Sequence, residues 1–166
     1  MRRTLTLFIA LSGLLGGGLV FAEEMLVSAG PAEFRAALDA RRDRVVLVNF
    51  WATWCRPCLK ELPDLLKLED KYAAQGFELL AVSLDEPVDR ETVVRPFLAK
   101  WFPGLRSLIR LSPDMDSMVS VVDPAWNEVL PTSYVLDGTG QVRAKLQGGK
   151  SAAEFEAAIL PLLVKP

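Results

Sequence analysis

Both cysteines of the chain lie in one stretch, which reads Phe50-Trp51-Ala52-Thr53-Trp54-Cys55-Arg56-Pro57-Cys58-Leu59-Lys60-Glu61-Leu62-Pro63. Residues 45–51 form a nearly continuous apolar run, which is typical of a strand buried on both faces. From about Cys55 to Gln75, leucines recur three or four positions apart, which predicts a helix. We expect Pro63 to bend this helix rather than end it, and Gly76 to cap it. The cysteine pair therefore stands at a strand-to-helix junction.

This position favours redox chemistry. Unpaired backbone N–H groups and the helix dipole stabilise an anion at a helix N-terminus, so Cys55 is expected to be the exposed nucleophilic thiolate. Cys58 lies one turn further on and is expected to resolve the mixed disulfide. Arg56 adds positive charge beside Cys55, and Pro57 fits the first turn of the helix. A Cys55–Cys58 redox disulfide would need no other cofactor.

Three other interpretations of the cysteines are weaker. A zinc site is disfavoured because the chain has no histidine and no third cysteine. A structural disulfide between residues three apart would close a very short loop and constrain the unfolded chain weakly. Two unrelated buried cysteines are less expected still. We therefore favour a redox pair, and we expect no metal.

The remaining pattern indicates an α/β layer structure, because predicted helices and strands alternate along the chain. A turn at Asp137-Gly138-Thr139-Gly140 predicts a hairpin. Residues 103–131 are rich in proline and hard to assign. Pro161 is expected to end or bend the last helix. The predicted elements are a helix over 31–42, a strand over 77–83, a helix over 91–100, a strand near 107–111, a helical turn near 115–121, the hairpin strands 133–136 and 141–146, and a helix from 151.

The first 22 residues have the features of a signal peptide. Arg2 and Arg3 precede an apolar run over residues 5–21, and Ala22 ends a small-residue cleavage site. An uncleaved membrane anchor through residues 5–21 is the alternative, although its glycines make a poor permanent helix. Either way, residues 23–166 form one domain in the periplasm or on the outer face of the cytoplasmic membrane, where disulfides persist.

The charge balance disfavours nucleic acid as a partner. Lys and Arg total 19 and Asp and Glu total 21, so the formal net charge is -2 and the chain has no basic footprint. The length of 166 residues suits a single globular domain. We expect a monomer.

Residues 50–63 resemble the active-site segment of the TlpA/ResA/DsbE-like thioredoxin family of exported thiol:disulfide oxidoreductases. Residues 76–85 and 130–140 resemble the family as well. The resemblance covers residues 30–165 and is weakest over 103–129. It implies a thioredoxin fold, with a central mixed β-sheet and helices on both faces.

The resemblance also implies a client-binding surface. Pro131 would be a cis-proline that faces the cysteine pair, and Leu130 would pair its main chain with an extended client peptide. From the sequence alone, Pro131 is an ordinary trans turn proline, since cis is the minority state. The residues expected to contact the client are Trp54, Arg56, Pro57, Leu130 and Thr132.

Glu61 is the candidate proton carrier. It lies three residues after Cys58 on the same helical face, and the resemblance implies that it exchanges protons with the cysteines. From spacing alone, a solvated surface glutamate is an equal alternative. Asn49 stands where cytoplasmic-type thioredoxins carry a buried aspartate, which leaves Glu61 as the nearby acid. Trp54 is expected to cover the active-site sulfur, while Trp51 and Trp126 are expected in the core.

The favoured function is reduction of disulfides in envelope proteins. The resemblance implies apocytochrome c cysteines as one client and a membrane thiol reductase of the DsbD or CcdA type as the electron donor. A peroxiredoxin-like peroxidase is one alternative, but its P-x-x-x-T-x-x-C pattern is absent before either cysteine. A non-catalytic copper carrier is another, and Met115 with Met118 is more often a core pair than a soft-metal site.

Overall fold

The structure is a computed structural model that describes residues 24–163. The predicted signal peptide over residues 1–22, and its alternative as an anchor through residues 5–21, lie outside the described residues. Within the described part of the chain, no helix is long and apolar enough to cross a membrane.

A six-stranded mixed sheet forms the centre of the molecule. Its strand order is β1-β4-β3-β2-β5-β6, with β1 to β4 parallel and β5 antiparallel to both β2 and β6. This confirms the predicted mixed sheet. The strands are β1 (Leu26–Ala29), β2 (Val45–Trp51), β3 (Phe77–Ser83), β4 (Ser107–Arg110), β5 (Thr132–Leu136) and β6 (Val142–Gln147).

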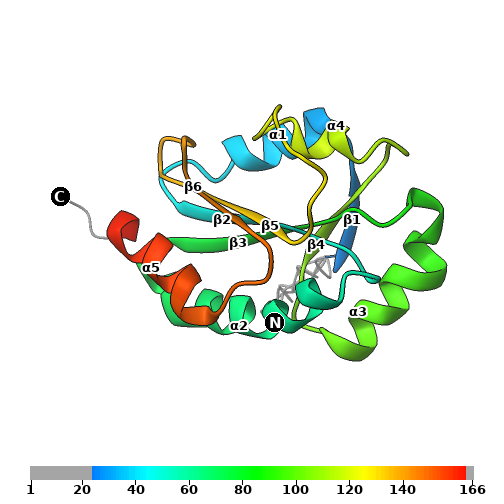
Figure 1. Cartoon of the computed structure of the whole chain (residues 1–166), viewed down its shortest axis with the longest axis horizontal. Coiled ribbons are helices and arrows are strands. Elements are labelled where there is room, and N and C mark those ends of the chain that lie inside the picture. The colour runs from blue at the N-terminus through cyan, green and yellow to red at the C-terminus, as the bar shows by residue number, and fades with distance from the viewer. Residues whose placement is uncertain (1–23, 164–166) are drawn as a thin grey trace, which may run out of the picture.

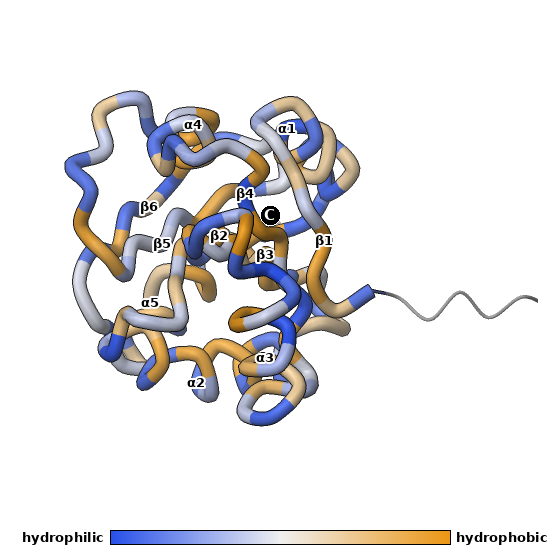
Figure 2. The backbone as a smooth tube through the Cα atoms, turned by 90° about the vertical axis from the view of Figure 1, so that its right-hand side faces the viewer, coloured by the Kyte–Doolittle hydropathy of each residue, from blue (hydrophilic) through white to orange (hydrophobic). Residues whose placement is uncertain are grey.

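Helices cover both faces of the sheet, as predicted (Figure 1). One face carries α1 (Pro31–Asp39) and α4 (Asp116–Val119), and the other carries α2 (Arg56–Tyr72), α3 (Arg95–Trp101) and α5 (Ala152–Leu163). Figure 2 shows the strands between these two sets of helices from the side. A π-helical turn, Arg90–Val94, leads into α3, and short 3-10 turns lie at Ala73–Gln75 and Pro87–Asp89. The thioredoxin fold is therefore confirmed.

Strand β2 lies at the centre of the core, and all seven of its residues are buried. Alternate side chains enter opposite layers, because successive residues of a strand point to opposite faces. Leu47 and Trp51 join the cluster under α2, whereas Val48 and Phe50 join the cluster under α1. Asn49 is the polar residue of this strand, and the alternation directs it toward α2.

Helix α2 begins directly after Cys55, which is its N-cap residue. Its apolar face packs on the sheet, with Leu62 and Leu65 fully buried. The helix continues nine residues beyond Pro63, so this proline does not end it, as expected. Gly76 follows the final turn with φ at 88°, a left-handed conformation that glycine adopts at little cost.

One strand was not predicted, one helix ends earlier than predicted, and one of the two alternatives for Pro161 is excluded. Strand β1 (Leu26–Ala29) was not predicted, because four residues at a sheet edge carry little pattern and their partner, β4, is distant in sequence. Helix α1 ends at Asp39 rather than at residue 42, since residues 40–43 form turns and Asp43 adopts a positive φ of 69°. Helix α5 continues past Pro161 to Leu163, so this proline does not end the helix.

Candidate active site

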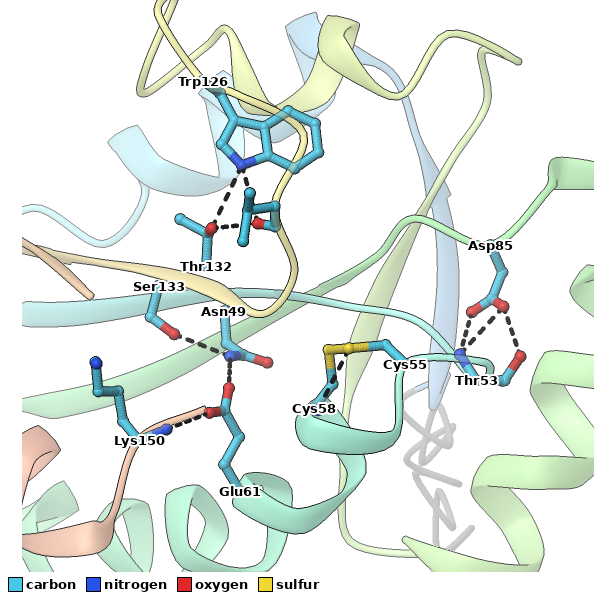
Figure 3. The surroundings of a disulfide bond; sticks show 11 residues. Asn49, Thr53, Cys55, Cys58, Glu61, Asp85, Trp126, Thr132, Ser133 and Lys150 are labelled. Carbon is cyan, nitrogen blue, oxygen red and sulfur yellow. Dashed lines mark hydrogen bonds between the residues drawn. A yellow bond between two sulfur atoms is a disulfide. The ribbon is translucent and has the colours of Figure 1, made fainter. Parts of the chain in front are cut away.

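Cys55 and Cys58 form a disulfide at the junction of β2 and α2 (Figure 3). The Cys58 backbone N–H donates to the Cys55 sulfur over 3.3 Å, which is the contact that would stabilise a thiolate there. Cys55 is 5% exposed and Cys58 is 0% exposed. Cys55 is thus the more exposed residue of the pair, in line with its predicted role. The expectation of an exposed Cys55 was too strong, because the disulfide lies within the apolar cluster under α2.

A buried carboxylate fixes the loop that carries the cysteines. Asp85, just after β3, accepts hydrogen bonds from the backbone N–H of Thr53 at 3.0 and 3.1 Å and from its hydroxyl at 2.6 Å. The Ser83 hydroxyl also donates to it over 2.7 Å. This role was not predicted from the sequence, since Asp85 lies 32 residues from Thr53 and only the parallel pairing of β2 with β3 brings them together.

The Asp85 segment is supported in turn by a buried arginine. The Arg110 guanidinium donates to the Leu84 carbonyl over 2.9 Å and forms an ion pair with Glu86 at 2.6 Å. The Leu84 N–H donates to the Trp51 carbonyl over 2.8 Å, directly upstream of the active-site loop. The ends of β2, β3 and β4 therefore hold the cysteine loop together.

Glu61 is buried behind the disulfide, with 2% of its surface exposed. Its carboxylate accepts hydrogen bonds from Asn49 Nδ2 at 2.8 Å and from the Lys150 backbone N–H at 3.2 Å. Burial raises the pKa of Glu61 to about 7, although both hydrogen bonds oppose the shift. The alternative of a solvated surface glutamate is therefore wrong, and the carboxyl can gain or lose a proton near neutral pH.

Asn49 links Glu61 to the neighbouring strand. Its Nδ2 donates to Glu61 and also to the Ser133 hydroxyl at 2.9 Å. Its Oδ1 is buried and has no hydrogen-bond partner among the described residues. In the sequence, Asn49 is notable only because it replaces an acid, and its bridge between Glu61 and Ser133 was not predicted.

The Leu130–Pro131 peptide bond is cis, as the family resemblance implied and the sequence alone did not. Trp126 stabilises the loop before this peptide bond. Its Nε1 donates to the Val129 carbonyl and to the Thr132 hydroxyl, each over 3.3 Å. The Thr132 hydroxyl donates to the same carbonyl over 2.5 Å. Thr132 is fully buried, so its side chain serves this network, and its contact with a client stays a prediction.

The other predicted client-contacting residues lie near the surface. Trp54 is 62% exposed, and Arg56 and Pro57 are exposed beside the disulfide. Leu130 is half-buried, and Val129 before it is 41% exposed. These side chains are available to a partner. Their contact with a client, and the covering of the sulfur by Trp54, stay predictions.

The methionine pair has the environment of core residues. Met118 is fully buried in the cluster under α1 and α4, and Met115 packs against that cluster. Within residues 24–163, no group of three or more histidine, cysteine, aspartate or glutamate side chains could hold a metal ion. The pair therefore offers no support for the copper-carrier alternative.

Several known proteins are similar to this chain. The AhpC/TSA family model matches residues 32–145. The thiol-disulfide oxidoreductase ResA of Geobacillus thermodenitrificans is 31% identical over 138 residues, which cover 77% of this chain and 74% of that protein. ResA of Bacillus cereus is 31% identical over 111 residues. That match covers 67% of this chain but only 59% of the length of the relative.

Solved structures agree with the fold. A Chlorobium tepidum structure described as a thiol:disulfide interchange protein DsbE superposes with a TM-score of 0.63 at 28% identity, covering 76% of this chain and 85% of that one. A secreted thiol-disulfide isomerase of Corynebacterium glutamicum superposes with a TM-score of 0.65 at 24% identity, covering 76% and 74%. At that lower identity the likeness supports the fold alone.

Proposed function

We propose that this chain, which belongs to the AhpC/TSA family and to the TlpA/ResA/DsbE-like group of thioredoxin-fold proteins, is a thiol:disulfide oxidoreductase that reduces disulfides of envelope proteins. One observation carries the proposal most directly. A Cys55–Cys58 disulfide caps a helix, and the buried carboxyl of Glu61 stands three residues further along that helix. The arrangement supplies a nucleophile, a resolving thiol and a proton carrier.

The reaction proceeds by two exchanges. The Cys55 thiolate attacks one sulfur of the client disulfide, forms a mixed disulfide and releases the first client thiolate, which takes a proton. Cys58 then loses its proton to the Glu61 carboxylate and attacks Cys55, which releases the second client sulfur as a thiolate. Glu61 returns the proton to this thiolate. The client gains two electrons and two protons, and the protein is left with its disulfide.

The proposed partners follow from the electrons and protons that the client gains in this reaction. A dithiol donor must return two electrons to the Cys55–Cys58 disulfide, and we propose a membrane thiol reductase of the DsbD or CcdA type. Clients are disulfide-bearing envelope proteins, with apocytochrome c cysteines as one candidate. The proposed location is the periplasm or the outer face of the cytoplasmic membrane, with the protein acting as a monomer.

Client trapping tests the mechanism. In a Cys58→Ala variant expressed with the full chain in its native envelope, mixed disulfides at Cys55 are expected to accumulate, because the resolving step is blocked. Cys55→Ala is the matched control, since it keeps only the fully buried Cys58. Absence of mixed disulfides in Cys58→Ala would contradict the exchange mechanism.

Two assays of the purified protein separate the alternatives. Catalysed reduction of insulin by dithiothreitol is expected, and loss of this activity is expected in Cys55→Ala. Appreciable peroxide consumption without an added thiol substrate would instead support the peroxidase alternative. Retention of copper after dialysis, together with no insulin reduction, would support the copper carrier.

A further inference from the structure

The side-chain amide of Asn49 is only half satisfied. Its Nδ2 donates to Glu61 and Ser133, whereas its Oδ1 is buried without a hydrogen-bond partner among the described residues. Leaving a buried acceptor unpaired carries a cost in free energy, and such groups are rare in folded proteins. The unpaired Oδ1 of Asn49 lies inside a redox site, so a change of redox state can supply its missing donor.

The direction of this oxygen is set by its neighbours. The Glu61 carboxylate accepts hydrogen bonds and cannot donate when ionised, so the NH₂ group of Asn49 must face it. The Oδ1 atom consequently points to the other side of the amide. In Figure 3 that side faces the disulfide of Cys55 and Cys58. The alternation of β2 agrees, because Asn49 shares its face with Trp51, in the cluster that contains Cys58.

We propose that Asn49 is a positioning residue whose Oδ1 accepts a hydrogen bond from the Cys58 thiol once the disulfide is reduced. The proposal rests on the proposed function, since it concerns the reduced state of the same site. In the disulfide, the Cys58 sulfur carries no hydrogen to donate. Reduction by a dithiol donor adds two electrons and two protons, breaks the Cys55–Cys58 bond and gives Cys58 an S–H group. The donor becomes a disulfide.

The hydrogen bond has two consequences. It favours the reduced protein over the disulfide, because the unpaired acceptor gains its partner only on reduction. It also holds Cys58 as a neutral thiol while Cys55 attacks the client, until Glu61 removes the proton. The ionisable groups near the Asn49 amide are Glu61 from α2 and Lys150 from the segment before α5. The Lys150 backbone N–H donates to the Glu61 carboxylate.

A single-thiol variant provides the direct test. Cys55→Ser leaves Cys58 as the one cysteine of the chain, and Glu61 is kept because its carboxylate fixes the direction of the Asn49 amide. In this background, Asn49→Leu is expected to raise the acid dissociation constant of the Cys58 thiol about fivefold, the effect of losing one ordinary hydrogen bond. The measurement is an NMR titration of the Cys58 Cβ shift. Ser133→Ala is the matched control, because it removes a partner of Nδ2 and leaves Oδ1 in place.

A second readout uses the intact cysteine pair. With Glu61 in place, Asn49→Leu is expected to shift the equilibrium with glutathione about fivefold toward the disulfide, a potential about 20 mV more negative. If Asn49→Leu does not fold, Asn49→Asp keeps an oxygen acceptor and is expected to lower the Cys58 dissociation constant rather than raise it.

The outcomes separate this inference from the proposed function. An unchanged Cys58 dissociation constant and an unchanged glutathione equilibrium in folded Asn49→Leu would overturn the role of Asn49, even if insulin reduction persisted. Failure of the wild-type protein to reduce insulin would overturn the proposed function instead. The thiol titration would still decide the hydrogen bond, because it requires no exchange activity.

Discussion

The buried carboxyl of Glu61 links folding to pH at the scale of a single residue. Burial raises its pKa from 4.5 to about 7 in the folded protein, so the folded state binds this proton more tightly than the unfolded state. The contribution to stability is therefore most favourable below pH 4.5. It is lost as the pH rises from there to about 7, where the folded protein must bury a charge.

We predict that Glu61→Gln removes this dependence. The free energy of unfolding of the wild-type protein, relative to the variant, should fall by up to about 3 kcal/mol between pH 4.5 and pH 8. Urea unfolding at both pH values measures it. Asp70→Asn, a change from carboxyl to amide on the exposed side of the same helix, is the control. Parallel pH profiles for wild type and Glu61→Gln would show that the carboxyl titrates normally.

The roles of some site residues could be predicted from the sequence, and those of others could not. Cys55 and Cys58 carry their chemistry in their spacing, so the pair was predicted from the residues themselves. For Glu61, the spacing predicted only that it shares a helical face with Cys58. Its buried environment involves Asn49 and the Lys150 segment, which lies 89 residues further along the chain. The cis bond before Pro131 has no signal in residue type, and only the family resemblance indicated it.

At the scale of elements, long buried strands and the amphipathic helix were predictable, and short edge elements were not. Strands β2 and β3 carry runs of seven residues that match their predicted bounds. Strand β1 has four residues and gains its order from pairing with β4, more than 75 positions away. The pairing of β2 with β3 brings Asp85 to the loop that precedes the cysteines, so local pattern could not assign it.

We predict that Asp85→Asn weakens this junction. The amide would place an NH₂ group against the Thr53 N–H or the Ser83 hydroxyl, which are donors to the native carboxylate. The expected effects are a loss of about 2 kcal/mol of stability and a disulfide exchange rate lower by about tenfold, because the cysteine loop is no longer held in place. Urea unfolding and insulin reduction measure the two effects.

A control separates stability from positioning in that experiment. Asp70→Asn, away from the junction, is expected to change neither quantity. The exchange rates are compared under conditions in which every variant is folded, as judged by circular dichroism. A destabilised Asp85→Asn protein that exchanges disulfides at the wild-type rate would show that Asp85 supports the fold without positioning the cysteines.

At the scale of the whole molecule, the fold should depend little on the redox state of the site. The disulfide joins residues three apart, so it restricts a very short loop of the unfolded chain. Two apolar clusters, one on each face of the sheet, hold the layers together without it. A protein that alternates between dithiol and disulfide during turnover needs this independence.

We therefore predict that reduction of the disulfide lowers the free energy of unfolding by no more than about 2 kcal/mol. Urea unfolding with and without dithiothreitol measures the difference, and a Cys55→Ser/Cys58→Ser variant should match the reduced protein. Leu65→Ala, which opens a cavity in the cluster under α2, is the contrasting change and should cost about 2–5 kcal/mol. If reduction alone unfolds the protein, the disulfide is structural, and the cysteine variants used for trapping would report on misfolding rather than on client exchange.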